Sequence, residues 1–269
     1  MARTNELAVL PHVVHRVLEI TSVDDCVGRD LEKTILIDPG FSSKVLVLAN
    51  SAAFGLPRRV SSVREAIMFL GYRTVRSVAL TVGLFDVFVG KTDQSSMRRR
   101  EWWRHSVDTA VCGRCIAMSS DQIPLEDAYT SGLLHLIGKS FMDRHGGMEY
   151  ELVEEMIEGG ASDLAAERAV YGCDHCEVAI EAARRWDLPL SLQSGLNYLQ
   201  PALPNDPFGS LRACTIVATR MASRAKHGAT DENAVCPEWA LERLGMVGAT
   251  MAELGAIGRR AIAEAEMRI

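Results

Sequence analysis

An all-α fold is predicted for this chain of 269 residues by three features of its sequence. Apolar residues recur at helical spacing along most of its length, and capping residues, glycines and prolines separate these stretches. No run of alternating β-branched residues indicates a strand. A hydrophobic content of 48% with 24% charged residues allows a sizeable core. We therefore expect helices packed around a common core.

The first helices are expected on either side of an Asp-Pro-Gly turn. The stretch from Leu7 to Ile20 has helical periodicity, and a second helix fits Leu31 to Ile37, with Asp30 able to cap its first turn. The turn at Asp38-Pro39-Gly40 is expected to end it, because the residue before a proline disfavours helical geometry and glycine permits a turn. A third helix is expected from Lys44 to Asn50.

Two further helices are expected between Ser61 and Phe85. Ser62 and Glu65 have the spacing of a capping box, Gly71 is expected to close the first helix, and Thr74 can open the second. A short helix, a glycine turn and a second helix also fit a DNA-binding helix-turn-helix. Two packed helices of any all-α core have the same pattern, so both interpretations stay open.

The second half of the chain continues the helical pattern after a polar run from Lys91 to Arg100, which marks a candidate boundary. A long helix is expected from about Trp102 to Met118, followed by one that Pro124 begins and Gly138 ends. Further helices are expected at 149–158, at 163–170, after the capping box of Asp174 and Glu177, and at 211–227, 237–245 and 250–269, with a proline-rich loop at 200–209.

The net charge of −6 argues against a dedicated nucleic-acid binder, because neutralisation of phosphates supplies most of that affinity. The segment 56–76 is basic although the whole chain is acidic, because it holds five arginines and one glutamate, a local charge of +4. A solvated helix face, a nucleic-acid surface and a patch for an anion or a protein partner all fit this segment. The residues of interest are Arg58, Arg59, Arg73 and Arg76.

Seven cysteines and the absence of a membrane or secretion signal lead us to expect a cytoplasmic protein. The apolar runs fall short of the roughly 20 residues of a membrane span, and an odd number of cysteines does not suit a disulfide framework. The pairs Cys112/Cys115 and Cys173/Cys176 lie too far apart for common zinc modules and fit packing inside helices. Zinc binding and redox chemistry remain the alternatives.

Four blocks of the sequence resemble the HDOD family, the HD-related output domains of bacterial signalling proteins within the HD-domain/PDEase-like superfamily. They are ILIDPGFSSKVLVLANSAAFGLPRRVSSVREAIMFLG, WWRHS, GLLHLIGK and GCDHCEVAIEAARRWDLP, in this order. The resemblance extends from about Leu10 to Leu254. It implies a two-lobed all-α protein, with an N-terminal helical lobe at 1–92 and an HD-like helical lobe at 99–269.

The same resemblance identifies a degenerate metal site. HD phosphohydrolases hold divalent metal with a His, a His-Asp doublet and further His or Asp ligands, and the positions of His105, His135 and His175 match such ligands. Leu136 stands where the doublet has Asp, and it cannot bind a metal. We therefore expect no catalytic residue and no cofactor, with the three imidazoles hydrogen-bonded in the interior. A residual metal site, or an anion pocket completed by Lys139, are the alternatives.

The function expected from the resemblance is that of a non-catalytic regulatory module in signal transduction, which contacts protein partners in the cytoplasm. Its basic residues, at 58–59 and in the run from Arg98 to Arg104, are expected to meet an acidic surface. Self-association stays open. Two other functions remain: a residual metal-dependent phosphohydrolase acting on phosphate esters or nucleotides, and a nucleic-acid-binding regulator that uses the basic segment 56–76. No nucleophile elbow, P-loop or dinucleotide-binding fingerprint is present in the sequence.

Overall fold

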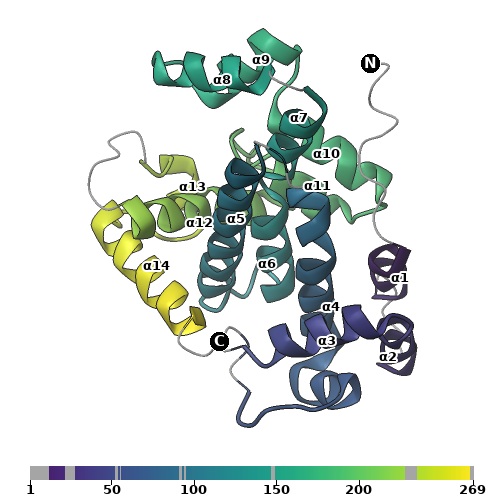
Figure 1. Ribbon diagram of the computed structural model, residues 1–269. Coiled ribbons are helices and arrows are strands. Elements are labelled where there is room, and N and C mark those ends of the chain that lie inside the picture. The colour runs from purple at the N-terminus through teal and green to yellow at the C-terminus, as the bar shows by residue number, and fades with distance from the viewer. Residues whose placement is uncertain are drawn as a thin grey trace.

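A computed structural model describes residues 12–21, 28–51, 54, 56–90, 93, 95–146, 149–227 and 235–266. Within these residues every regular element is an α-helix, which confirms the predicted all-α fold (Figure 1). The helices are α1 (His12–Thr21), α2 (Gly28–Leu36), α3 (Pro39–Ala49), α4 (Val63–Val89), α5 (Ser96–Ala117), α6 (Leu125–Leu134), α7 (Ile137–Gly146), α8 (Glu149–Glu158), α9 (Asp163–Tyr171), α10 (His175–Arg185), α11 (Leu190–Leu196), α12 (Gly209–His227), α13 (Glu238–Arg243) and α14 (Met251–Glu266).

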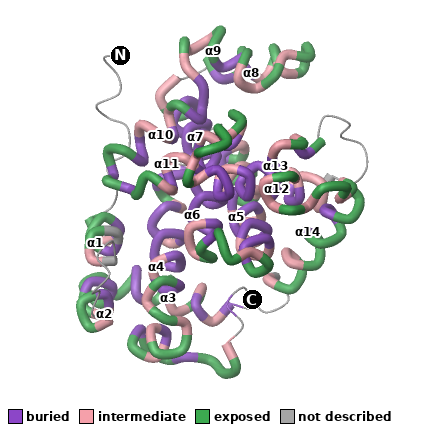
Figure 2. The backbone as a smooth tube through the Cα atoms, turned by 180° about the vertical axis from the view of Figure 1, so that it is seen from behind, coloured by how far each residue is buried: buried purple, intermediate pink, exposed green. Residues whose placement is uncertain are grey.

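The centre of the molecule is formed by α5, α6 and α12, which pack against one another. Helices α1, α2 and α3 pack on α4, and α8 and α9 pair at the opposite end of the molecule (Figure 1). One hydrophobic cluster extends without a break from Val14 in α1 to Leu254 in α14. Figure 2 shows buried residues concentrated in these central helices, while α1–α3, α8 and α14 expose much of their surface. A smaller cluster around Tyr150 and Val153 holds α8 to α9.

Helix α4 connects the N-terminal helices to the centre. At Gly71 its backbone leaves helical geometry, with φ 77° and ψ 160°, so the predicted break is confirmed, although the two segments join without a loop. The far end of α4 is capped from other helices: Arg144, Ser140 and Arg99 donate hydrogen bonds to the carbonyl groups of residues 87, 88 and 89. The last carbonyl groups of a helix lack partners within it, so these three side chains fix α4 against α5 and α7.

By length and composition, α4 is the one helix in the described part of the chain that could span a membrane. We expected the apolar runs here to be too short for this, and the length of 27 residues arises because two predicted helices join. Half of the most apolar window is buried inside the fold. The helix packs against α1, α2, α3, α5, α6 and α7, so in this structure it serves as a core helix.

The start of α3 corrects the prediction that this helix begins at Lys44. It begins at Pro39, and Asp38 is its N-cap, with a side-chain oxygen that accepts a 3.0 Å hydrogen bond from the backbone N–H of Phe41. Proline suits the first helical position because its missing N–H would have no partner there. The Asp-Pro-Gly turn therefore starts a helix as well as following one. Likewise α5 begins at Ser96, within the run expected to be a boundary, and Asp30 lies inside α2.

Two of the four arginines between residues 98 and 104 differ from the expectation of a partner surface, while Arg100 and Arg104 are exposed. Arg98 and Arg99 both form ion pairs with the buried Asp143 of α7, and Arg98 also binds Glu154 of α8. Arg99 is only 1% exposed. These two side chains hold α5, α7 and α8 together, because a buried carboxylate requires such charged partners.

Glycines set the distances between the helices that carry the family motif. The prediction that Gly138 ends a helix is wrong: α6 ends at Leu134, a turn follows, and Gly138 lies in α7. A β-carbon on Gly138 would lie 1.9 Å from the carbonyl oxygen of His175, and one on Gly132 would lie 2.8 Å from the α-carbon of Ala110. Only glycine permits these approaches of α7 to α10 and of α6 to α5.

Substitution of Gly138 by alanine is expected to destabilise the protein by about 1–3 kcal/mol or more, because the added methyl group must push α7 away from α10. Gly159→Ala is the control, since Gly159 is exposed and its nearest new contact would be 3.3 Å away. Urea unfolding of both variants measures the difference. Equal stability of the two variants would show that the α7–α10 approach is not tight.

Candidate functional site

The histidines of the motif come together in the interior. His105 lies on α5, His135 in the turn after α6, and His175 at the start of α10. The ring centroids of His105 and His135 are 5.4 Å apart, and Tyr198, which follows α11, lies 5.3 Å from His135 and 6.0 Å from His175. The structure thus joins the three predicted imidazoles into one cluster, and a tyrosine completes it.

His175 uses both of its ring nitrogens. Its Nδ1 lies 2.7 Å from Glu167 Oε2 on α9, and its Nε2 lies 2.9 Å from the hydroxyl oxygen of Tyr198. The backbone N–H of His175 also donates to Glu167 Oε2 at 2.9 Å, and Tyr150 donates to the other oxygen at 3.3 Å. Because a carboxylate only accepts, the arrangement fits a proton on Nδ1 and donation from Tyr198 to Nε2. Burial holds the pKa of Tyr198 well above its ordinary value, so its hydroxyl keeps the proton.

His135 is fully buried and has one unpaired ring nitrogen. Its Nδ1 lies 2.7 Å from the carbonyl oxygen of Gly132, which can only accept, so Nδ1 carries the proton. Its Nε2 has no hydrogen-bond partner within the described chain. Burial, and then the neighbouring His105, hold the pKa of His135 well below its usual range, with smaller contributions from His175 and Lys139. The ring is therefore neutral at neutral pH.

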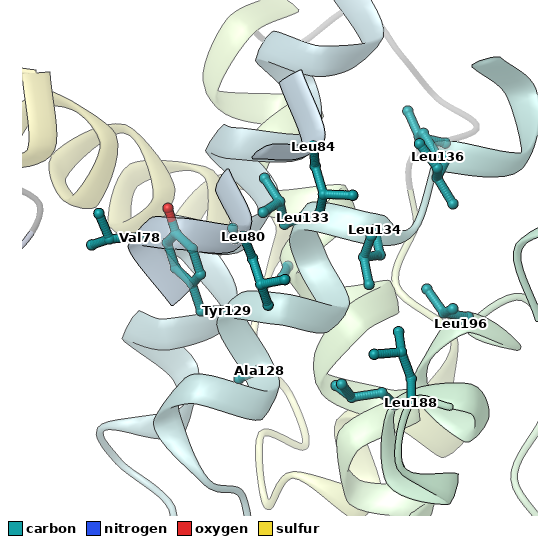
Figure 3. Close-up of a cluster of buried hydrophobic side chains, with 14 of the residues drawn as sticks. Val78, Leu80, Leu84, Ala128, Tyr129, Leu133, Leu134, Leu136, Leu188 and Leu196 are labelled. Atoms are coloured by element: carbon teal, nitrogen blue, oxygen red, sulfur yellow. The ribbon is translucent and has the colours of Figure 1, made fainter. Parts of the chain in front are cut away.

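Leu136 lies in the core, 7% exposed, among other apolar side chains such as Leu134 and Leu196 (Figure 3). It offers no ligand atom, and both nitrogens of His175 are used by protein groups. The described residues contain no group of three His, Cys, Asp or Glu side chains that could hold a metal ion. The residues at this position therefore do not fit the divalent metal centre of an HD phosphohydrolase.

Lys139 is also buried, at 8% exposed, and it forms an ion pair with Asp163 of α9. Burial alone would raise the pKa of Asp163, but the Lys139 ammonium outweighs it and lowers that pKa below the ordinary value. The charge of Lys139 is thus already matched by a carboxylate. Its predicted part in an anion pocket stays a prediction.

The predicted basic residues of 56–76 lie in different surroundings. Arg58 forms a 3.2 Å ion pair with Glu65 and places its guanidinium 5.0 Å from the ring centroid of Phe69, while Arg59 is exposed. Arg73 donates to the hydroxyl of its neighbour Tyr72. Arg76 is partly buried and lines a cavity between α1 and the turn that follows α10. Arg58, Arg73 and Arg76 thus have separate sets of contacts, and the use of this segment for nucleic acid stays a prediction.

The cysteines of the two C-x-x-C pairs are free thiols. Burial raises the pKa of each of these four thiols, Cys112, Cys115, Cys173 and Cys176. A protonated thiol is a poor metal ligand and a poor nucleophile, so these residues fit the predicted packing role. Cys26 lies outside the described residues.

Glu167 is the residue of this site that sequence reasoning missed. It lies on α9, which reads as an acidic amphipathic helix, and nothing in its spacing distinguishes it from the exposed Glu155 or Glu158 on α8. Its burial at 0% exposed follows from packing with α8 and α10, which no local pattern reveals. The hydrogen bond between Tyr198 and His175 is likewise not visible in the sequence, because the two residues lie 23 positions apart.

Comparison with known proteins agrees with this architecture. Residues 7–200 match the HDOD domain family. An uncharacterised protein from Treponema pallidum is 25% identical over 189 residues, which are 70% of this chain and 36% of that protein. The chain therefore spans about a third of the length of this relative.

Solved structures with the same fold cover nearly the whole chain. An HDOD domain protein of unknown function from Geobacter sulfurreducens has a TM-score of 0.77 at 23% identity, with 97% of this chain and 92% of that chain covered. A protein from Shewanella amazonensis, proposed to be a phosphohydrolase, has a TM-score of 0.74 at 21% identity, covering 99% and 95%. A protein from Marinobacter aquaeolei, proposed to act in signal transduction, has a TM-score of 0.74 at 20% identity. The match covers 98% of this chain and 60% of that chain.

The buried neutral ring of His135 predicts a loss of stability in acid. Its pKa is lowered in the folded state, so the unfolded chain takes up the proton first, and stability falls as the pH drops below about 6.5. One such group contributes a slope of about 1.4 kcal/mol per pH unit. The free energy of unfolding is measured in urea from pH 7.5 to 5. Its dependence on pH should be weaker in His135→Gln than in the wild type, by the amount that corresponds to about one proton.

Leu196→Ala is the control for this measurement, because it removes buried packing from the same core without altering a histidine or a hydrogen-bond partner of one. It is expected to lower stability at every pH and to keep the wild-type slope. An unchanged slope in His135→Gln would contradict this, because it would mean that His135 binds its proton alike in the folded and unfolded states.

Proposed function

The chain belongs to the HDOD domain family, and we propose that it is a non-catalytic regulatory module of signal transduction that acts through contacts with protein partners. The observation that carries the proposal is the closed hydrogen-bond chain from Glu167 through His175 to Tyr198. Glu167 and Tyr198 form hydrogen bonds with both ring nitrogens of His175, and Leu136 stands where an HD phosphohydrolase has its anionic ligand. Of the two roles proposed for the similar structures, phosphohydrolase and signal transduction, the second suits this chemistry.

The surface that we propose for a partner lies at the start of α4. Arg58 and Arg59 are exposed there, and Met68 and Phe69 on the outer side of α4 are 75% and 44% exposed. Phe69 lies under the guanidinium of Arg58, at 5.0 Å. Arginine and aromatic side chains supply most of the binding energy at many protein interfaces. An acidic partner with an apolar centre would match this surface, and a cytoplasmic location fits the free thiols.

The test uses the charge-reversed variant Arg58→Glu/Arg59→Glu in the full chain. Partners captured by the wild type are identified by mass spectrometry, purified and titrated against both proteins. We expect at least about a tenfold loss of affinity, because two attractive charges become repulsive. The control is Arg259→Glu/Arg260→Glu, an exposed arginine pair on α14, which should bind as the wild type does.

Two results would contradict the proposal. One is a partner set and affinity that do not change in the Arg58/Arg59 variant. The other is hydrolysis of p-nitrophenyl phosphate or of a cyclic dinucleotide with added Mn²⁺ that disappears in His135→Gln, since this would make the imidazole cluster an active site.

A further inference from the structure

A small cavity lies between α1 and α4 on one side and the turn that joins α10 to α11 on the other. Its volume is about 100 Å³. Trp186, Leu188 and Pro189 form an apolar wall, and the first two are nearly buried, at 6% and 4% exposed. The cavity is separate from the imidazole cluster, with which it shares no residue.

Arg76 points a cationic group into this cavity without an acceptor for it. No hydrogen bond or ion pair to Arg76 occurs within the described chain, and its Nε is buried and unpaired. Burial lowers the pKa of Arg76, and the nearby carboxylates of Asp127 and Glu126 oppose this. A guanidinium carries five N–H donors in a planar fork that matches a carboxylate, so donors remain for a ligand.

The two neighbouring carboxylates accept hydrogen bonds from other residues, although Glu126 Oε2 has no partner within the described chain. Glu126 Oε1 accepts from Arg114 at 3.1 Å and from Thr74 at 3.2 Å. Asp127 accepts from Ser191 at 3.3 Å. They stabilise the charge of Arg76 from a distance and leave its buried Nε unpaired. Leaving buried donors unpaired is costly, so the site gains when an acceptor enters.

Asp187 brings the opposite charge to the same cavity. It is the one non-glycine residue of the described chain with a positive φ, at 51°, and it lies exposed in the turn with no ion pair. Aspartate tolerates this conformation because its short side chain can bond locally. Glu19 also lines the cavity, but Arg16 binds its carboxylate at 2.7 Å.

We propose that this cavity binds a small zwitterion, a compact molecule with a carboxylate and an ammonium, such as a free amino acid with a short side chain. The carboxylate would bind the Arg76 fork, and the ammonium would face Asp187. A phosphate dianion would instead place a like charge against Asp187. The cavity is smaller than the roughly 150 Å³ that holds benzene in another protein, which limits the ligand to a few carbon atoms.

This inference goes beyond the proposed partner contacts and does not depend on them. A bound zwitterion would touch α4 and the α10–α11 turn at once, so it would link the N-terminal helices to the centre of the molecule.

The test is calorimetric titration of the full chain with L-alanine, and with acetate, ethylamine and phosphate for comparison. We expect saturable 1:1 binding of alanine, weaker binding of acetate, and no binding of ethylamine or phosphate. Arg76→Met should weaken alanine binding by about tenfold or more, since it removes the charge-assisted hydrogen bonds. Arg73→Met, on the same helix but outside the cavity lining, is the control and should bind as the wild type does.

Asp187→Asn separates the two halves of the site. Asparagine also tolerates a positive φ, so the turn should be kept. This variant should lose affinity for alanine and keep the wild-type affinity for acetate. If Arg76→Met does not fold, as shown by circular dichroism, Arg76→Lys and Asp187→Asn carry the test.

Three results would overturn the proposal. They are the absence of saturable heat with alanine, tighter binding of phosphate than of alanine, and unchanged alanine binding in folded Arg76 variants. The last result would mean that Arg76 serves only as the countercharge of Glu126 and Asp127.

Discussion

The buried hydrogen bonds of Glu167 and His175 are the interaction on which the C-terminal helices depend. Glu167 comes from α9, His175 starts α10, and Tyr198 follows α11, so one imidazole ties three segments together. A fully buried carboxylate is costly unless it is paired and hydrogen-bonded, which fixes these segments relative to one another. Gly138 then brings α7 against the carbonyl group of the same histidine.

This network also decides the chemistry of the site. Both ring nitrogens of His175 are used to hold helices, and Leu136 contributes packing where an anionic ligand would be required. The contacts that we propose with other molecules lie elsewhere, at the exposed Arg58 and Phe69 at the start of α4 and in the cavity lined by Arg76.

The sequence predicted most helices correctly because their signals are local: apolar periodicity, and caps such as Asp174 with Glu177. It failed where one signal has two meanings, as at Pro39, which can follow one helix and start the next. It also failed where the cause lies far away in the chain. The close approach at Gly138, the Arg98 partner Asp143 and the burial of Glu167 all depend on segments distant in sequence, so no window of residues reveals them.

The most direct test of the closed site is NMR of ¹⁵N-labelled histidine rings in the full chain, with Zn²⁺ added up to one equivalent. Because both nitrogens of His175 are hydrogen-bonded to Glu167 and Tyr198, the account predicts that its ring resonances keep their positions and widths. A metal-dependent shift or broadening of the His135 and His175 ring signals at one equivalent of metal would contradict it, because that would show imidazoles exchanging protein partners for a metal ion.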